Sequence, residues 1–405
     1  MTARRWLTAT VSVLTAALVL GACGSSGGSG SGGGGGSADS GGSPGASPVS
    51  RGAAGQPATV TITLTSAGCE PKPASVGAGP VEFTVRNNGA AAVTEAELKS
   101  ADLAHIFGEK ENLTPGLSGA FSVTLQPGRY TVQCPGAEAQ NWDFTVTGQA
   151  TGPSWESKPD LVQAVSRYTA FVGFSTGSLL RSTRAFCFAV KAGDRSLAKQ
   201  RYAQARVFYE QIEPVAEVFG DLDTQIDGRW QNPVTRKSEF MGFHRLEQIL
   251  WDEPSMTGAT ALCQGLMDHE EKLVTLVSKA KYSPQEMASG ATDLINEAAT
   301  SKITGEEERY SHTDLVDFDA NMKASIKVAS LLAPYLQTVD PDLVSLIQRR
   351  NVDVQKLLAK YQAQPGYEHT GYVKYTQVTK AERRELSGVV NAFAEALSGM
   401  PAKVS

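Results

Sequence analysis

The spacing of apolar residues changes at Thr151-Gly152-Pro153, and this change divides the chain into two kinds of structure. Before it, apolar and polar residues alternate as in half-buried β-strands, and after it apolar residues recur at helical spacing. The alternating segments, separated by turn sequences rich in Gly, Pro and Asn, are 60–64, 81–85, 121–125, 130–132 and 143–146. The pattern predicts a multidomain chain: a small all-β sandwich over residues 56–148, then an all-α helical bundle over residues 154–405.

The first 55 residues carry a targeting signal and a tether. Residues 1–22 combine adjacent arginines, a short apolar run and small residues, which is typical of a signal peptide. Residues 20–23 read Leu-Gly-Ala-Cys, which resembles the bacterial lipobox and predicts that Cys23 is lipidated after cleavage. Residues 23–55 are rich in Gly and Ser and predict a flexible linker. We therefore expect an extracytoplasmic protein, lipid-anchored to the cell membrane.

The charge of the chain narrows the class of partner. Its 405 residues carry a formal net charge of −5, with an isoelectric point near 5.7. This balance argues against nucleic acid as a partner and suits a protein that handles cations. Beyond the signal peptide, no apolar stretch has the length that a transmembrane helix requires.

An imidazole and a carboxylate lie three residues apart among apolar neighbours, at His244 and Glu247. On a helix this spacing puts both side chains on one face, together with Phe240, Phe243 and Trp251. A carboxylate on an apolar face needs a compensating partner, because an unpaired buried charge is costly. Two interpretations remain open from the pattern: a hydrogen-bonded pair in the core, or part of a metal site.

Carboxylates are also concentrated upstream of this pair. Glu210, Glu213 and Glu217 recur opposite an apolar stripe, so periodicity favours a solvated acidic face over metal ligands. Asp227 follows in a segment that resembles a turn, where aspartates most often cap helices.

The cysteines divide by segment. Cys69 and Cys134 lie in the alternating segment, and Cys187 and Cys263 lie in the helical one. Export permits disulfides, but the sequence does not fix their connectivity. Cys69 and Cys134 therefore form either a disulfide, with Glu95 and Glu97 on a strand face, or a second metal site with those carboxylates.

The turn at residues 125–130, followed by Cys134, resembles the cupredoxin domains. A blue-copper site needs a histidine and an axial methionine soon after that cysteine, and residues 135–141 supply neither. An electron-transfer copper site is therefore not predicted.

Several long motifs together resemble the EfeO family of iron-uptake proteins, in which a cupredoxin-like domain precedes an imelysin-like domain with an HxxE motif. The motifs are residues 209–214, 221–223, 226–227, 242–247 and 302–315. The resemblance implies an iron-binding lipoprotein that captures iron, Fe2+ or Fe3+, and passes it to a membrane iron permease. A haem peroxidase-like protein would be a further partner.

The resemblance also implies which residues bind metal. In the helical domain they would be His244, Glu247, Glu213 and Asp227, a hard, oxygen-rich set suited to iron, manganese or zinc. His312, Asp314 and Asp317 would orient these ligands or cap a helix. In the first domain, zinc or copper would bind near Cys69, Glu95, Glu97 and Cys134, although Gln133 stands where a soft methionine would favour copper.

Imelysin-like proteins have also been classed as metallopeptidases, so a zinc peptidase is the alternative function. The HxxEH motif requires histidine at Gln248, and HExxH requires glutamate at Arg245, so neither pattern is present. A distant third ligand would have to be His269 or His312, and no general base can be assigned. The sequence therefore favours a carrier with no catalytic residues. A third possibility is a purely structural module, in which His244 and Glu247 would be hydrogen-bonded partners in the core.

Overall fold

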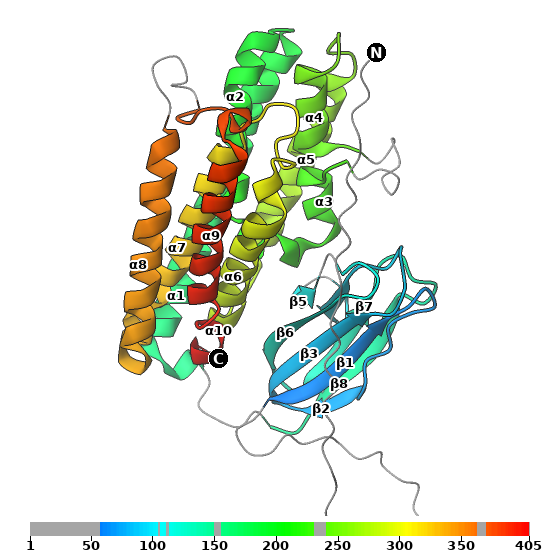
Figure 1. Cartoon of the computed structure of the whole chain (residues 1–405). Helices are drawn as coiled ribbons and strands as arrows, with labels where there is room; N and C mark the ends of the chain where they lie inside the picture. The colour runs from blue at the N-terminus through cyan, green and yellow to red at the C-terminus, as the bar shows by residue number, and fades with distance from the viewer. Residues whose placement is uncertain are drawn as a thin grey trace, which may run out of the picture. The chain divides into compact units, whose positions relative to one another are not determined.

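The protein is described by a computed structural model that covers residues 57–103, 106–110, 113–149, 155–230, 240–362 and 370–404. The predicted signal peptide, the predicted lipidation site at Cys23 and the predicted linker lie outside the described residues. Figure 1 shows strands in the first part of the chain and helices in the second, as the spacing of apolar residues predicts. No described helix is both long enough and apolar enough to cross a membrane.

The first domain is a sandwich of two sheets. One sheet has the strand order β1-β3-β6 and the other β2-β8-β7-β4-β5. The pairs β1–β3 and β2–β8 are parallel, and the remaining pairs are antiparallel. The strands are β1 (Ala58–Leu64), β2 (Ser75–Gly77), β3 (Gly79–Asn87), β4 (Ala96–Ser100), β5 (Ile106–Lys110), β6 (Ser118–Leu125), β7 (Gly128–Gln133) and β8 (Asn141–Thr147).

Alternation builds the core of this sandwich. Every second residue of β1 is buried, and Val60, Ile62 and Leu64 are fully inaccessible to solvent. Phe83 of β3 and Phe144 of β8 meet edge to face with ring centroids 5.4 Å apart, which joins the two sheets. The five predicted strands are confirmed as β1, β3, β6, β7 and β8. The alternating pattern does not predict β2 or β5, which are short. It does not predict β4 either, because this strand buries four successive residues.

The second domain is a helical bundle. Its α-helices are α1 (Pro159–Lys191), α2 (Arg195–Glu210), α3 (Asp221–Asp227), α4 (Gly242–Trp251), α5 (Ala259–Val277), α6 (Pro284–Thr300), α7 (Asp314–Val339), α8 (Pro341–Leu358), α9 (Lys380–Leu397) and α10 (Pro401–Val404). Its 3-10 turns are η1 (Trp155–Ser157), η2 (Glu213–Val215), η3 (Glu217–Phe219), η4 (Lys302–Thr304), η5 (Ala359–Tyr361) and η6 (Tyr375–Gln377).

The bundle is organised around α1, which packs against α2, α5 and α7. A disulfide between Cys187 of α1 and Cys263 of α5 joins two of these helices covalently. A capping box begins α6: Ser283 Oγ accepts the backbone N–H of Glu286, and the Glu286 carboxylate accepts that of Ser283.

The acidic run after α2 is not one continuous helix. The α-helix ends at Glu210, and the turns η2 and η3 follow. Pro214 lacks a backbone N–H and would break a continued helix, whereas it fits the first turn of η2. Glu210, the last residue of α2, is fully buried beside Arg206 of the preceding turn, and the Glu213 side chain in η2 is only 13% exposed. The predicted solvated acidic face was wrong for both residues. Glu210 lies on the side of α2 that buries Arg206 and Tyr209, and the chain leaves the α-helix before Glu213.

Candidate metal centre

The start of α4 brings His244 next to Asp227. Gly242, the first residue of α4, has φ +73°, and a Cβ there would collide with the Ile226 backbone carbonyl. Glycine thus lets α4 begin directly against the end of α3. His244 Nε2 then lies 3.6 Å from Asp227 Oδ1, and the His244 residue is only 2% exposed.

Glu247 sits one turn further along α4 and faces the same imidazole. Its Oε2 lies 3.5 Å from His244 Nδ1, and its Oε1 accepts the backbone N–H groups of Tyr310 (2.9 Å) and Ser311 (2.6 Å). A carboxylate held in this way favours the histidine tautomer with its proton on Nδ1. The Nε2 lone pair is then free to bind an ion.

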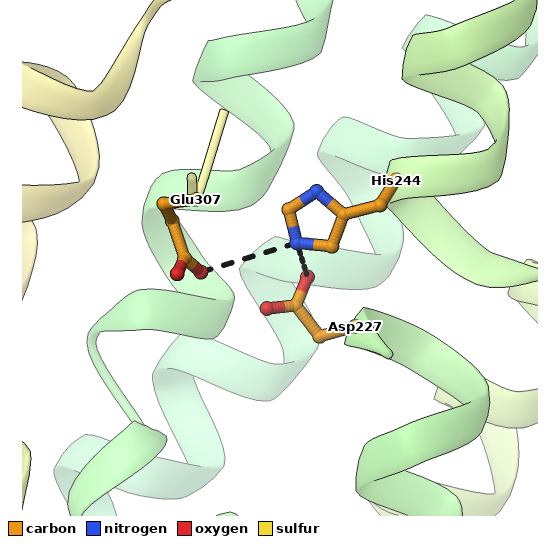
Figure 2. A group of neighbouring side chains, drawn as sticks. All are labelled: Asp227, His244 and Glu307. Atoms are coloured by element: carbon orange, nitrogen blue, oxygen red, sulfur yellow. Dashed lines mark ion pairs between the residues drawn. The ribbon is translucent and has the colours of Figure 1, made fainter. Parts of the chain in front are cut away.

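His244 Nε2 is buried and has no hydrogen-bond partner among the described residues. Figure 2 shows it between two carboxylates from different elements, Asp227 at the end of α3 and Glu307 in the turn before α7. The Nε2 atom lies 3.6 Å from the Asp227 carboxylate and 3.9 Å from that of Glu307. A nitrogen and two oxygens thus converge around one point.

Three overlapping groups of side chains in the described part of the chain have ligand atoms within 4.8 Å of one another. They are Asp227–His244–Glu307, His244–Glu247–Glu308 and Glu210–Glu213–Glu307. His244 links the first two groups, and Glu307 links the first and third. We call the residues of these three groups the carboxylate cluster.

Four ligands were predicted in this domain. Of these, Glu247 and Asp227 lie next to the two ring nitrogens of the third, His244. Glu213 lies in the group without histidine, where Lys302 Nζ forms an ion pair with it and Asn321 Nδ2 donates to it at 2.6 Å. The η2 backbone reaches this position because Gly290 of α6 has no Cβ, which would collide with the Pro214 carbonyl.

Arg206 holds much of the carboxylate cluster together. Its side chain is completely buried and forms ion pairs with Glu210, Asp227, Glu308 and Asp317, the Glu308 contact being 2.7 Å long. These charge-assisted contacts offset part of the cost of burying so many carboxylates. Two buried cations, Arg206 and Lys302, and the partly exposed Arg229 face the six carboxylates of the cluster and the adjacent Asp317. The six are Glu210, Glu213, Asp227, Glu247, Glu307 and Glu308. The excess negative charge suits a further cation.

The pKa shifts follow from this imbalance. Burial and nearby Arg206 lower the pKa of His244, but Asp227 and Glu247 outweigh them and raise it to about 9. Burial alone would raise the pKa of Glu307, but the positive charges of Lys302 and Arg229 outweigh this effect and lower the pKa to about 2. Burial, followed by the charge of Glu247, raises the pKa of Glu308 well above its usual range. In the metal-free protein, protons therefore supply part of the missing positive charge.

Several residues of the cluster were not predicted as ligands. Glu307 and Glu308 belong to a motif that the sequence analysis singled out, but they lie in a turn segment, where no periodicity indicates the direction of a side chain. Three consecutive acidic residues, 306–308, were the available signal. Of the residues expected to orient the ligands, Asp317 contacts Arg206, while Asp314 Oδ1 accepts the Glu308 backbone N–H at 3.2 Å.

The residues predicted for a second site in the β-sandwich are arranged differently. Cys69 and Cys134 are joined by a disulfide, so in this form neither offers a thiolate. Glu97 forms an ion pair with Lys99 at 2.8 Å, and burial together with the Glu97 charge raises the pKa of Glu95 to about 7. None of the three groups found among the described residues includes them.

Comparisons with known proteins agree with this architecture. The imelysin family, which is named as a peptidase family, matches residues 164–400, and the cupredoxin-like domain family matches residues 45–141. The chain thus combines a cupredoxin-like domain with an imelysin domain. It is 37% identical to the iron uptake system component EfeO of Escherichia coli K12, Shigella flexneri and Shigella sonnei.

Each of these alignments spans 343 residues, 84% of this chain and 89% of the relative. The chain belongs to the EfeO family of iron uptake system components.

Proposed function

We propose that this chain is an extracytoplasmic iron-binding lipoprotein that captures iron in the carboxylate cluster and passes it to a membrane iron permease. The observation that carries the proposal is the buried His244 Nε2, which has no hydrogen-bond partner among the described residues and faces Asp227 and Glu307. A buried polar atom of this kind calls for a partner. An excess of carboxylates around it makes a cation the fitting one.

His244, Asp227 and Glu307 would bind the ion directly, since their ligand atoms already converge. Glu247 would orient the imidazole from the opposite side, as carboxylates commonly do for metal-bound histidines. Glu213 would act from the neighbouring group that shares Glu307, together with Glu210. One nitrogen with several carboxylate oxygens suits iron, manganese or zinc, and the name of the relatives favours iron.

The internal cations suit a carrier that must also release its cargo. Arg206 and Lys302 hold the carboxylates in place without a metal, so the site is largely preformed. An incoming ion must compete with these cations for the same oxygens, which moderates its affinity. Preformation with moderate affinity favours reversible capture.

Peptidase activity is the second candidate, because the matching family is named for it. Neither His269 nor His312 falls in any of the three groups formed by the described residues, which speaks against either one as the third ligand of a zinc peptidase. Zinc-loaded protein assayed with a peptide library separates the two functions. Turnover that disappears in a His244→Ala, Glu247→Ala double variant would favour the peptidase.

Location and partners complete the proposal. The residue pattern at 20–23 supports a lipid anchor at Cys23, and the relatives' name supports partners in an uptake system, which we propose to be the permease and a haem peroxidase-like protein. Uptake of radiolabelled iron by cells lacking their own copy of the chain tests the transfer. The parent should restore uptake, and the double variant should not; equal restoration by both would contradict the proposed role of the site.

A further inference from the structure

A cavity of about 330 Å3 lies in the helical domain beside the carboxylate cluster. Residues near the start of α2, the end of α4 and two connecting segments enclose it, including Lys199, Trp251, Ser311, His312 and Lys374. Its size falls within the range of about 300–1,000 Å3 common for small-molecule sites. None of the residues of the carboxylate cluster lines this cavity.

The lining of the cavity is basic. Lys199, Lys374 and His312 line it, and no carboxylate does so among the described residues. Neither lysine has an ion pair within the described part of the chain, and Lys199 Nζ lies 5.1 Å from the centre of the Trp251 ring. Burial, nearby Arg195 and Lys374 lower the pKa of Lys199, which agrees with a local excess of positive charge.

One short segment separates this basic cavity from the acidic cluster. Ser311 lines the cavity, yet its backbone N–H donates to Glu247 and its hydroxyl donates to Glu308 at 2.5 Å. Thr313 also lines the cavity, and its Oγ1 donates to the same Glu308 carboxylate at 3.2 Å. His312, between them, has φ +57°, in the left-handed region. The segment therefore presents one side to the cavity and the other to the carboxylates.

We propose that this cavity binds a small anion carrying two or three carboxylates, held by Lys199 and Lys374 with His312 at its side. Two lysines without carboxylate partners among the described residues match such an anion in charge, and each ammonium group can donate hydrogen bonds to its carboxylates. Polycarboxylates of this class chelate iron through hard oxygen donors. This inference rests on the proposed function: the cavity would hold the chelator while the carboxylate cluster takes the iron from it. That step is a ligand exchange in which no electron moves and the chelator leaves with its carboxylates ionised.

Citrate is the probe for this proposal. Calorimetry with the metal-free full chain should detect citrate binding to the parent, weakened at least tenfold in a Lys199→Gln, Lys374→Gln double variant. A matched control is Lys323→Gln, which removes an exposed lysine paired with Asp319 on α7 and should leave citrate binding unchanged. Thermal unfolding checks that the variants fold. No citrate binding to the parent, or equal binding to the double variant, would overturn the proposal, and so would inorganic phosphate binding as tightly as citrate.

Two further comparisons test whether the anion brings iron with it, and whether the anion site and the iron site can fail independently. Ferric citrate should bind the parent more tightly than free citrate, and a His244→Ala variant, which keeps the contact of Glu247 with Ser311, should lose that difference while still binding free citrate. Equal binding of both forms to the parent would overturn the role in chelate delivery. Ferrous sulfate should bind the lysine double variant as it binds the parent. A parent that binds citrate but no iron would contradict the iron carrier and leave the anion site standing.

Discussion

His244 Nδ1 lies 3.5 Å from Glu247 Oε2 within one turn of α4, and the other oxygen of Glu247 is held by two backbone N–H groups. The carboxylate therefore has little freedom to move, and it fixes the plane of the imidazole. The consequence is directional, because His244 Nε2 is presented to Asp227 and Glu307 (Figure 2). The HxxE spacing thus acts as an orienting device as well as a source of donors.

Glu247→Gln should weaken iron binding by about 10–100-fold, since loss of an orienting carboxylate typically costs that much. Calorimetry with ferrous iron under anaerobic conditions measures the effect. Glu253→Gln is the control, because Glu253 pairs with Arg245 at the protein surface. Parent-like affinity in Glu247→Gln would show that the carboxylate does not position the imidazole.

Iron affinity should rise with pH from about 6 to about 9. The pKa of His244 is raised to about 9, so the metal-free protein holds an imidazolium at neutral pH, and the ion must displace its proton. Titrations in buffers of different ionisation enthalpy count the protons released. By the same shift, His244 stabilises the metal-free fold fully below its ordinary pKa of 6.5, and this contribution is lost as pH rises through 9. A flat affinity profile without proton release would contradict the assignment.

Glu270→Gln should stabilise the protein at pH 8 by about 1–3 kcal/mol. Glu270 of α5 is fully buried, and among the described residues its carboxylate accepts one hydrogen bond, from Thr183 Oγ1 at 2.7 Å; burial raises its pKa to about 8. The folded protein therefore keeps a proton that the unfolded chain loses near pH 4.5, and stability falls as pH rises between these values.

Urea unfolding at pH 5 and pH 8 measures this effect. The two proteins should be nearly equal in stability at pH 5, and the variant should be more stable at pH 8. Glu271→Gln is the neighbouring control, since Glu271 is exposed and pairs with Arg184. A Glu270→Gln variant that loses stability with pH as steeply as the parent would contradict the prediction.

Gly242→Ala should lower the free energy of unfolding by about 1–3 kcal/mol and weaken iron binding. The alanine would be strained at φ +73°, and its Cβ would push α4 away from Ile226 and Asp227. Gly265→Ala in α5 is the control: no atom lies near its added Cβ, so it should stabilise the helix by about 0.5–1 kcal/mol. Unchanged stability and iron affinity in Gly242→Ala would show that α4 tolerates a side chain there.

Much of the fold could be predicted because periodicity reports burial. Alternation located β1 and β3, and helical spacing located the bundle that follows Pro153. The end of α2 was harder, because Glu210 and Glu213 continue the helical spacing up to Pro214. The pairing of the cysteines depends on which helices and strands meet, which local sequence does not specify.

The site could be predicted only where its residues belong to regular structure or to a known motif. His244 and Glu247 share a helical face, so their proximity follows from spacing alone. Glu307 and Glu308 lie in a turn, and Arg206 contacts them from α2, so these contacts arise only from tertiary packing. The grouping of Glu213 with Lys302 rather than with His244 has the same origin.

Substitution of Glu307 tests the proposed metal centre most directly, because the exposed glutamate just before it, Glu306, provides a matched control. Glu307 is 3% exposed and lies 3.9 Å from His244 Nε2, whereas the Glu306 side chain is 60% exposed and pairs with Arg309. Calorimetry of iron binding to Glu307→Gln and Glu306→Gln should show at least a tenfold loss of affinity in the first and none in the second. Equal affinity in both variants and the parent would contradict a metal centre at His244, Asp227 and Glu307.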